Sequence, residues 1–214
     1  MIPIGSRVNA GIGELIVQKF LGKGKSGYSY QCEISNELLI LKIMHDEESP
    51  YYHFASDKTS VEINAYKKLK ELGITIPKLI ESNLEKQYLI KEFIEGRTAA
   101  ELIACNKINE KIIEQLFVMS YKTKTAKLNI DFFPTNFVIK KEELYYIDYE
   151  INTYCEEWNL ENWGIYYWAN SKGFAEFLKT HDAVSINRNI EKGIPFKIPF
   201  EEQVKEWIEL YSKN

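Results

Sequence analysis

The sequence is poor in cysteine, histidine and arginine, and each shortage argues against a class of protein. Its cysteines and histidines are Cys32, Cys105, Cys155, His45, His53 and His181. Because the cysteines are odd in number, widely spaced and outside any C-x-x-C pattern, we expect neither a disulfide framework nor a zinc site. The histidines also lack the spacing of metal ligands. These features fit a reducing compartment, and we expect a cytoplasmic protein.

The charge balance is slightly acidic, with 27 Lys and Arg against 31 Asp and Glu and a net charge of −4. Arginine occurs only as Arg7, Arg97 and Arg188. We therefore do not expect binding that depends on bidentate arginine contacts to phosphates or bases. No apolar run is long enough to span a membrane, and no basic stretch followed by an apolar run marks a signal peptide. We therefore expect no nucleic-acid and no membrane partner, while the oligomeric state stays open.

Periodicity divides the 214 residues into a strand-rich first part and a helix-rich second part. Strands are predicted at 12–20, 28–34, 38–44, 79–83 and 87–94, the first three as an antiparallel meander, with a polar, irregular stretch at 45–58 and a helix at 61–72. Helices are predicted within 98–127, 156–180 and 200–213, with two short strands between 129 and 150. This order predicts an α+β fold with an N-lobe at 1–91, a hinge at 92–97 and a C-lobe at 98–214.

The stretch LGKGKSGYSY, residues 21–30, contains two phosphate-loop patterns. Its G-K-S matches the end of a Walker A loop, but Lys19 stands where that loop needs glycine, and no helix follows. A Rossmann G-x-G-x-x-G loop also needs a following helix. A strand on each side instead indicates a glycine-rich hairpin over ATP phosphates. In such a hairpin Gly22, Gly24 and Gly27 allow close backbone approach and positive φ.

Two charged residues are expected to pair in the interior. Lys42 lies in the apolar run 38–44, and a lysine in a buried run needs an anionic partner. Glu62 shares a helix face with Tyr66 and Leu69, so it can point inward toward Lys42. The alternatives are an exposed lysine on an edge strand and a solvated glutamate near the start of its helix.

Three polar residues follow at loops and strand ends, namely Asp131, Asn136 and Asp148. Phosphoryl transfer requires two carboxylates and an amide of this kind, because one group accepts the proton of the acceptor hydroxyl and the others give oxygen ligands to Mg²⁺. For Asp131 taken alone, a turn or capping role is the alternative.

In order and spacing, these pieces resemble the protein-kinase-like fold over about residues 21–168. The matching motifs are LGKGKSG for the glycine loop, LILKIM, KEFIEG for the hinge, NIDFFPTN for the catalytic loop and IDYE for the metal-binding loop. The resemblance implies a bilobal fold with a small β-rich N-lobe and a short, mostly helical C-lobe. It also implies that the chain binds ATP and Mg²⁺.

The resemblance implies a role for each matching residue. In the glycine loop, the ATP-binding residues would be Gly22, Lys23, Gly24, Lys25, Ser26 and Gly27. Lys42, paired with Glu62, would hold the α- and β-phosphates. The backbone of Glu92 and Ile94 would meet the adenine. Asp131 would orient the acceptor hydroxyl and act as base, and Asn136 and Asp148 would hold Mg²⁺.

The chain departs from ordinary protein kinases around two of these motifs. The H-R-D triplet is N-I-D ending at Asp131, and the D-F-G triplet is D-Y-E beginning at Asp148. Nothing after Asp148 resembles an activation segment closed by A-P-E, and the residue directly before Asp131 is not an arginine. Regulation by activation-loop phosphorylation is therefore not expected.

The acceptor class depends on two features that point in different directions. The D-x-E pattern is similar to choline kinases and aminoglycoside phosphotransferases. The short tail of 64 residues, 151–214, is more similar to minimal atypical kinases of the RIO type and to small bacterial serine/threonine kinase-like proteins. Because so short a tail limits how a small ligand is enclosed, we favour an atypical serine/threonine protein kinase. A small-molecule kinase is the alternative, and a non-catalytic nucleotide-binding scaffold is the alternative of another class.

Overall fold

The computed structural model of the chain describes residues 1–47 and 57–212, so His53 and much of the irregular stretch predicted at 45–58 lie outside the described residues. The chain forms two compact units. The first comprises Met1–Lys68 and Pro77–Ile94, and the second comprises Leu69–Ile76 and Glu95–Asn214. Residues 69–76, predicted within the N-lobe, cluster with the second unit because Leu69 and Ile74 are part of its core.

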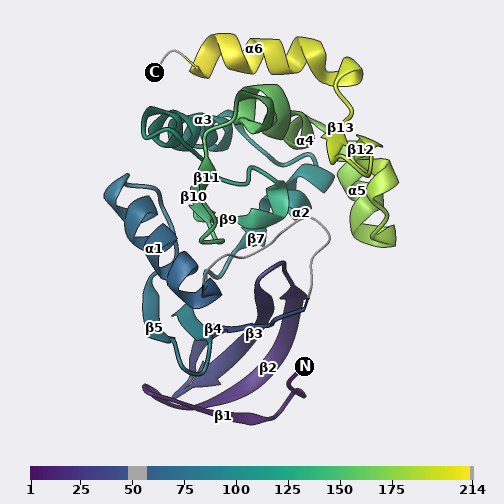
Figure 1. The fold of residues 1–214 in the computed structure, drawn as a ribbon. Coiled ribbons are helices and arrows are strands. Elements are labelled where there is room, and N and C mark those ends of the chain that lie inside the picture. The colour runs from purple at the N-terminus through teal and green to yellow at the C-terminus, as the bar shows by residue number, and fades with distance from the viewer. Residues whose placement is uncertain (48–56, 213–214) are drawn as a thin grey trace. The chain divides into compact units, whose positions relative to one another are not determined.

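The first unit is built on a six-stranded antiparallel sheet in the order β1-β2-β3-β4-β6-β5 (Figure 1). Its strands are β1 (Arg7–Ala10), β2 (Gly13–Lys23), β3 (Gly27–Ile34), β4 (Glu37–Met44), β5 (Leu79–Asn83) and β6 (Tyr88–Glu92). The predicted meander is therefore confirmed as β2, β3 and β4, and the two later strands are also present. The first strand was not predicted.

One face of this sheet forms the core of the first unit. The buried residues of that core are Leu15, Val17, Tyr30, Cys32, Leu39, Leu41, Tyr88 and Ile90. Since side chains alternate along a strand, Ile40 and Lys42 of β4 point to the opposite face. Helix α1 (Lys58–Glu71) supplies the partner of Lys42 there.

The ends of α1 are set by local chemistry. Both carboxylate oxygens of Asp57 accept backbone N–H groups, from Thr59 at 3.1 Å and from Ser60 at 3.2 Å, which is how an N-cap satisfies the first turn. Beyond the last helical residue, Gly73 takes φ +65°, a left-handed conformation that glycine adopts readily. The predicted helix at 61–72 is thus confirmed, with its start at Lys58.

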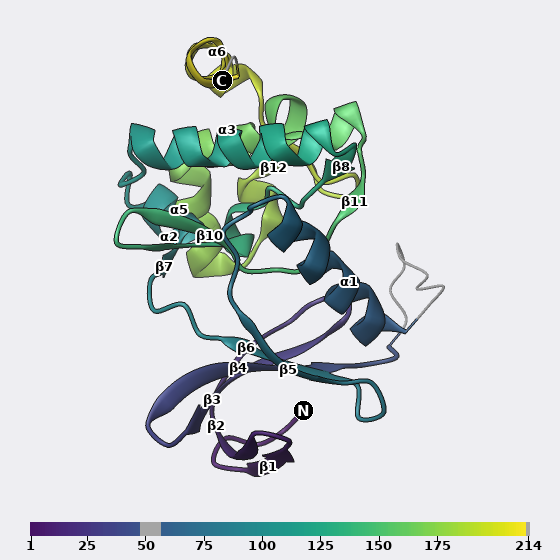
Figure 2. The ribbon, with the colours of Figure 1, turned by 90° about the vertical axis from the view of Figure 1, so that its left-hand side faces the viewer.

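The second unit is mostly helical (Figure 2). Its α-helices are α2 (Ala99–Ala104), α3 (Glu110–Thr125), α4 (Ile165–Ala169), α5 (Ser171–Thr180) and α6 (Glu201–Tyr211), and Leu160–Gly164 is a π-helix. Short 3₁₀ turns occupy Pro134–Asn136, Glu156–Trp158, Ala183–Ser185 and Ile198–Phe200. The short strands are β7 (Arg97–Thr98), β8 (Leu128–Asn129), β9 (Phe137–Lys140), β10 (Glu143–Tyr146), β11 (Asn152–Thr153), β12 (Asn187–Asn189) and β13 (Ile194–Pro195).

A single large apolar core holds the second unit together. Helix α3 packs on α6, and α2 packs on α5, so the apolar faces of the helices are turned inward. Buried aromatic residues of this core are Phe117, Phe132, Phe137, Tyr146, Tyr167, Trp168 and Phe174. The predicted α+β class, a β-rich first unit followed by a mostly helical one, is confirmed.

The helical stretches predicted at 98–127 and 200–213 are both present. The first contains two helices, because the α2 cap at Cys105 ends one and Asn109 begins the next. The closing helix predicted at 200–213 is α6, and its last predicted residue, Lys213, lies outside the described residues. Within the described parts of the chain, no helix is long and apolar enough to cross a membrane.

Candidate active site in two groups of residues

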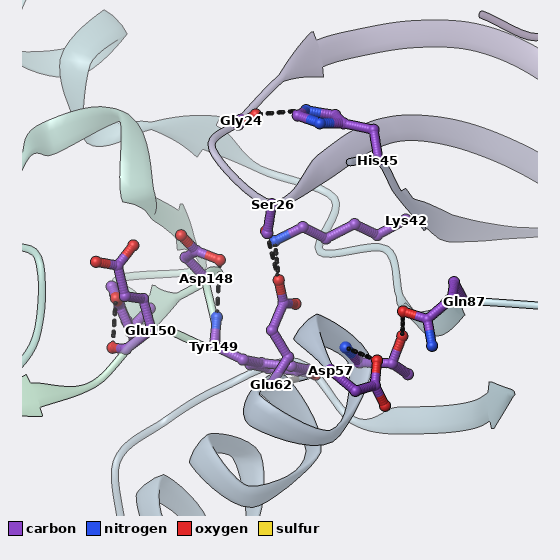
Figure 3. Close-up of polar contacts among 12 residues, drawn as sticks. Gly24, Ser26, Lys42, His45, Asp57, Glu62, Gln87, Asp148, Tyr149 and Glu150 are labelled. Carbon is purple, nitrogen blue, oxygen red and sulfur yellow. Dashed lines mark hydrogen bonds and ion pairs between the residues drawn. The ribbon is translucent and has the colours of Figure 1, made fainter. Parts of the chain in front are cut away.

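Lys42 and Glu62 form a buried ion pair in the first unit (Figure 3). The Lys42 Nζ lies 2.5 Å from the Glu62 Oε1. Lys42 is 7% exposed and Glu62 is 5% exposed, and β4 is paired on both sides, with β3 and with β6. The alternatives of an edge-strand lysine and a solvated glutamate are therefore ruled out. The pair that the sequence predicted is present, and its role toward a nucleotide stays a prediction.

The glycine-rich stretch forms the β2–β3 hairpin, with the turn at 24–26. Lys23 pairs with Tyr28, and the Gly24 N–H donates to the Gly27 carbonyl at 2.9 Å. None of Gly22, Gly24 and Gly27 has a positive φ, so the conformational freedom that we expected them to supply is not what the hairpin uses. The hairpin prediction itself, with a strand on each side, is confirmed.

The three glycines differ in what surrounds them. A Cβ built on Gly27 would lie 2.5 Å from the Ile43 carbonyl oxygen, because β3 runs directly beside β4 there. Among the described residues, a Cβ on Gly24 would meet only the Gly27 oxygen at 3.8 Å, and one on Gly22 would meet nothing within 4 Å. Packing therefore requires glycine at position 27, whereas positions 22 and 24 have room above the backbone.

This contrast predicts different outcomes for two alanine substitutions. Gly27→Ala is expected to lower the free energy of unfolding by about 2 kcal/mol, because the Ile43 backbone must move. Gly24→Ala is expected to change it by less than about 0.5 kcal/mol, yet to weaken ATP binding if the turn approaches phosphate closely. Urea unfolding and ATP titration of both variants measure the two effects. An equal loss of unfolding free energy in both variants would contradict the conclusion that Gly27 is tightly packed and Gly24 is not.

A second set of contacts holds the hairpin from the end of β4. The His45 ring Nε2 lies 3.1 Å from the Gly24 carbonyl oxygen. Glu47 is bound by the Lys23 ammonium and by the Tyr28 hydroxyl. These hydrogen bonds, that from Lys23 first, lower the pKa of the Glu47 carboxyl to about 2. Lys23 is therefore occupied by Glu47 in this structure, and Lys25 is exposed in the turn.

The two residues predicted to meet adenine lie at the end of the first unit. The Glu92 N–H donates to the Lys78 carbonyl at 2.9 Å, and the Glu92 Oε2 accepts the Lys78 N–H at 3.2 Å. Because the N–H of Glu92 is engaged, an adenine contact by this residue would use its carbonyl. Ile94 follows and is 5% exposed.

The second unit brings Asp131, Asn136 and Asp148 together at one end of the β9–β10 hairpin. Phe137 pairs with Tyr146, so Asn136 and Asp148 flank the same end, and the Ile147 N–H donates to the Asn136 carbonyl at 2.9 Å. The Asn136 amide reaches the Asp131 carbonyl at 3.4 Å. All three predicted residues therefore belong to one cluster of polar groups.

The carboxylates of Asp131 and Asp148 are oriented by neighbouring backbone groups. The Asp148 Oδ1 accepts the Tyr149 N–H at 2.9 Å (Figure 3). The Asp131 Oδ1 accepts the Phe133 N–H at 3.0 Å. A carboxylate that is held in this way presents its other oxygen in a defined direction. The turn role considered for Asp131 is thus present, and it is compatible with a chemical role.

Tyr146 links the two loops and was missed in the sequence. Its hydroxyl accepts the Asp131 N–H at 3.4 Å and donates to the Glu150 carbonyl at 3.0 Å. Burial, and then the charges of Asp148, Asp131 and Glu150, raise the pKa of Tyr146 well above its ordinary value. The hydroxyl therefore stays protonated and can serve both contacts. The sequence signal at Tyr146 is its place in the alternation of β10. That alternation indicates a core residue and says nothing about the contacts of the hydroxyl.

The residue that stands in place of the H-R-D histidine has defined partners in the structure. Asn129, at the histidine position, is 6% exposed and donates from its amide to the Cys155 carbonyl at 2.9 Å. It also pairs through β8 with Asn152 of β11. The short segment after Asp148 is thus attached to the loop that carries Asp131 at both ends, through Tyr146 and through Asn129.

The residue after Asp131 is held in place by burial and by a hydrogen bond. Phe132 is 1% exposed, and its carbonyl accepts the Trp168 indole N–H at 2.9 Å. A Cβ built on Gly164 would lie 2.4 Å from the Phe132 Cβ, so the π-helix packs directly on this aromatic ring. The position of Asp131 is therefore fixed by packing as well as by hydrogen bonds.

The donor sets fit the ligands that the resemblance implies. Among the described residues, no cluster of three or more His, Cys, Asp or Glu side chains is arranged to hold a metal. Asn136 and Asp148 alone would leave most positions around an ion to phosphate and water oxygens, which is typical of Mg²⁺. In the described part of the first unit, the buried Glu62 Oε2 has no hydrogen-bond partner, and it lies beside the lysine predicted to meet phosphate.

Comparisons with known proteins add little beyond the fold. No family model matches the chain, and no curated protein matches it. The solved structure of vaccinia related kinase 3 is similar at a TM-score of 0.44 and 15% sequence identity, over 72% of this chain and 53% of that chain. This chain thus spans about half the length of that kinase, and we base the functional proposal on the residues described above.

Proposed function

We propose that the chain is an ATP- and Mg²⁺-dependent phosphotransferase that transfers the γ-phosphoryl group of ATP to a hydroxyl acceptor. The observation that carries the proposal is the buried Lys42–Glu62 ion pair beside the glycine-rich turn. A fully desolvated pair of this kind is costly to build, and packing alone does not call for it on a central strand. A phosphate-binding role gives a reason to keep it.

Each residue group then has a defined task. Glu62 holds the Lys42 ammonium, which binds the α- and β-phosphates from the sheet. Asn136 and Asp148 would hold Mg²⁺, which when bound neutralises charge on the phosphates. Asp131, oriented by the Phe133 N–H, orients the acceptor hydroxyl and takes its proton as the oxygen–phosphorus bond forms and ADP departs.

The acceptor is proposed to be a serine or threonine hydroxyl of a protein, in the manner of a minimal atypical protein kinase. A small amino alcohol or aminoglycoside is the alternative acceptor, and the D-x-E pattern of Asp148 and Glu150 favours it. The Glu150 carbonyl accepts the Tyr146 hydroxyl, which fixes the backbone at this position. A phosphorylation screen with a protein mixture and a panel of such small molecules separates the two.

Thermal unfolding with Mg·ATP tests the nucleotide site directly. At about ten times the dissociation constant, Mg·ATP is expected to raise the unfolding temperature by about 3 °C. The Mg²⁺-dependent part is expected to disappear in Asp148→Asn, because the amide lacks the negative charge that holds the ion. Asp182→Asn is the matched control, since Asp182 caps a turn through Oδ1 and Val184 N–H and asparagine caps equally well. No shift in any variant would refute nucleotide binding.

A further inference from the structure

Ser26 connects the glycine-rich turn to the ion pair (Figure 3). Its hydroxyl donates to the Glu62 Oε1 at 2.7 Å, the same oxygen that lies 2.5 Å from the Lys42 Nζ. The other oxygen, Oε2, is buried and has no hydrogen-bond partner among the residues that the structure describes. One carboxylate oxygen therefore holds both a strand and the turn.

Two further contacts join the turn to His45, the residue after β4. The His45 N–H donates to the Ser26 carbonyl at 3.1 Å, and the His45 ring meets the Gly24 carbonyl. These backbone contacts define the shape of the turn. The Ser26 hydroxyl is the side-chain contact that ties this shape to Glu62, and thereby to the lysine.

A serine hydroxyl has one hydrogen, so when phosphate displaces the turn, the hydroxyl exchanges its bond to the Glu62 carboxylate for one to water. We propose that Ser26 is a latch, a positioning residue whose hydrogen bond to Glu62 holds the turn down on the Lys42–Glu62 pair until nucleotide phosphate displaces it. This inference rests on the proposed function. It adds that phosphate and turn compete, so that binding of the phosphates includes breaking a charge-assisted hydrogen bond.

Hydrogen exchange of the nucleotide-free protein tests whether the latch holds the turn. In Ser26→Ala, amides of residues 21–30 are expected to exchange about tenfold faster, because the turn opens more often. Ser26→Thr keeps a hydroxyl and is expected to restore the wild-type rate. Ser60→Ala removes a hydrogen bond of the same kind, from hydroxyl to Asp57 carboxylate at 2.7 Å, and is expected to leave the turn unchanged. Unaltered exchange in Ser26→Ala overturns the latch.

Titration with ADP and with adenosine tests the competition. Ser26→Ala is expected to bind ADP about tenfold more tightly than the wild type, while adenosine, which lacks phosphate, binds both equally. Weaker or equal ADP binding in Ser26→Ala overturns the inference and leaves the proposed function standing, provided that the wild type binds ADP. If no variant binds ADP, the proposed function fails and the competition fails with it.

Discussion

Asp131→Asn is expected to lower phosphoryl transfer by about a thousandfold, because an amide cannot take the proton of the acceptor hydroxyl. The substitution is nearly isosteric, and asparagine Oδ1 can still accept the Phe133 N–H that orients the native carboxylate. Structure and nucleotide affinity should therefore be retained while the chemical step is lost. The measurement is ADP release in the presence of the acceptor that the screen identifies.

The unfolding temperature of Asp131→Asn serves as the internal control for that measurement. A variant that is as stable as the wild type and still binds Mg·ATP isolates the chemical role of the carboxylate. An unchanged rate of ADP release would show that Asp131 is only the turn residue that its contact with Phe133 suggests. The chain would then be a nucleotide-binding scaffold or would use another base.

Glu62→Ala is expected to cost about 3 kcal/mol of unfolding free energy, because it leaves the Lys42 ammonium buried without this partner. The cost includes the Ser26 hydrogen bond to the same oxygen. The double variant Lys42→Met with Glu62→Leu is expected to recover most of the loss, since apolar residues of similar volume carry no desolvation penalty. Urea unfolding of the wild type and the variants measures both steps.

An exposed pair in the same chain provides the comparison for Glu62. Lys205 and Glu209 lie one helical turn apart on α6 at 3.9 Å, with most of both side chains in solvent. Glu209→Ala is expected to cost less than about 0.5 kcal/mol. A Glu62→Ala cost as small as that of Glu209→Ala would mean that the Lys42–Glu62 pair is not desolvated in solution.

Most of the fold followed from patterns within single elements. Alternation and β-branched residues located β2, β3 and β4, and the α1 helix followed from its periodicity and from Gly73. The first strand, with the sequence RVNA, has only a short half-buried alternation, too little to distinguish it from a loop. The π-helix at 160–164 was also not predicted, because its apolar spacing is close to that of an ordinary helix.

The candidate site was predictable where a residue was out of place in its own element. Lys42 in an apolar strand and Asp148 after one could be identified on that basis. The contact from Ser26 to Glu62 joins residues 36 positions apart and depends on how a hairpin lies on a helix, which no local pattern encodes. Tyr146 was missed for a different reason, since its hydroxyl contacts are invisible in a residue that also fits the core.

The close packing of Gly164 on Phe132 ties two positions of the sequence to each other. Because the added Cβ would fall 2.4 Å from the Phe132 Cβ, any larger residue at position 164 requires glycine at 132, which has no Cβ, or a shift of the π-helix. In a set of homologous sequences, the two positions should therefore covary. Such covariation would identify relatives of this chain even where the residues around Asp131 and Asp148 have diverged.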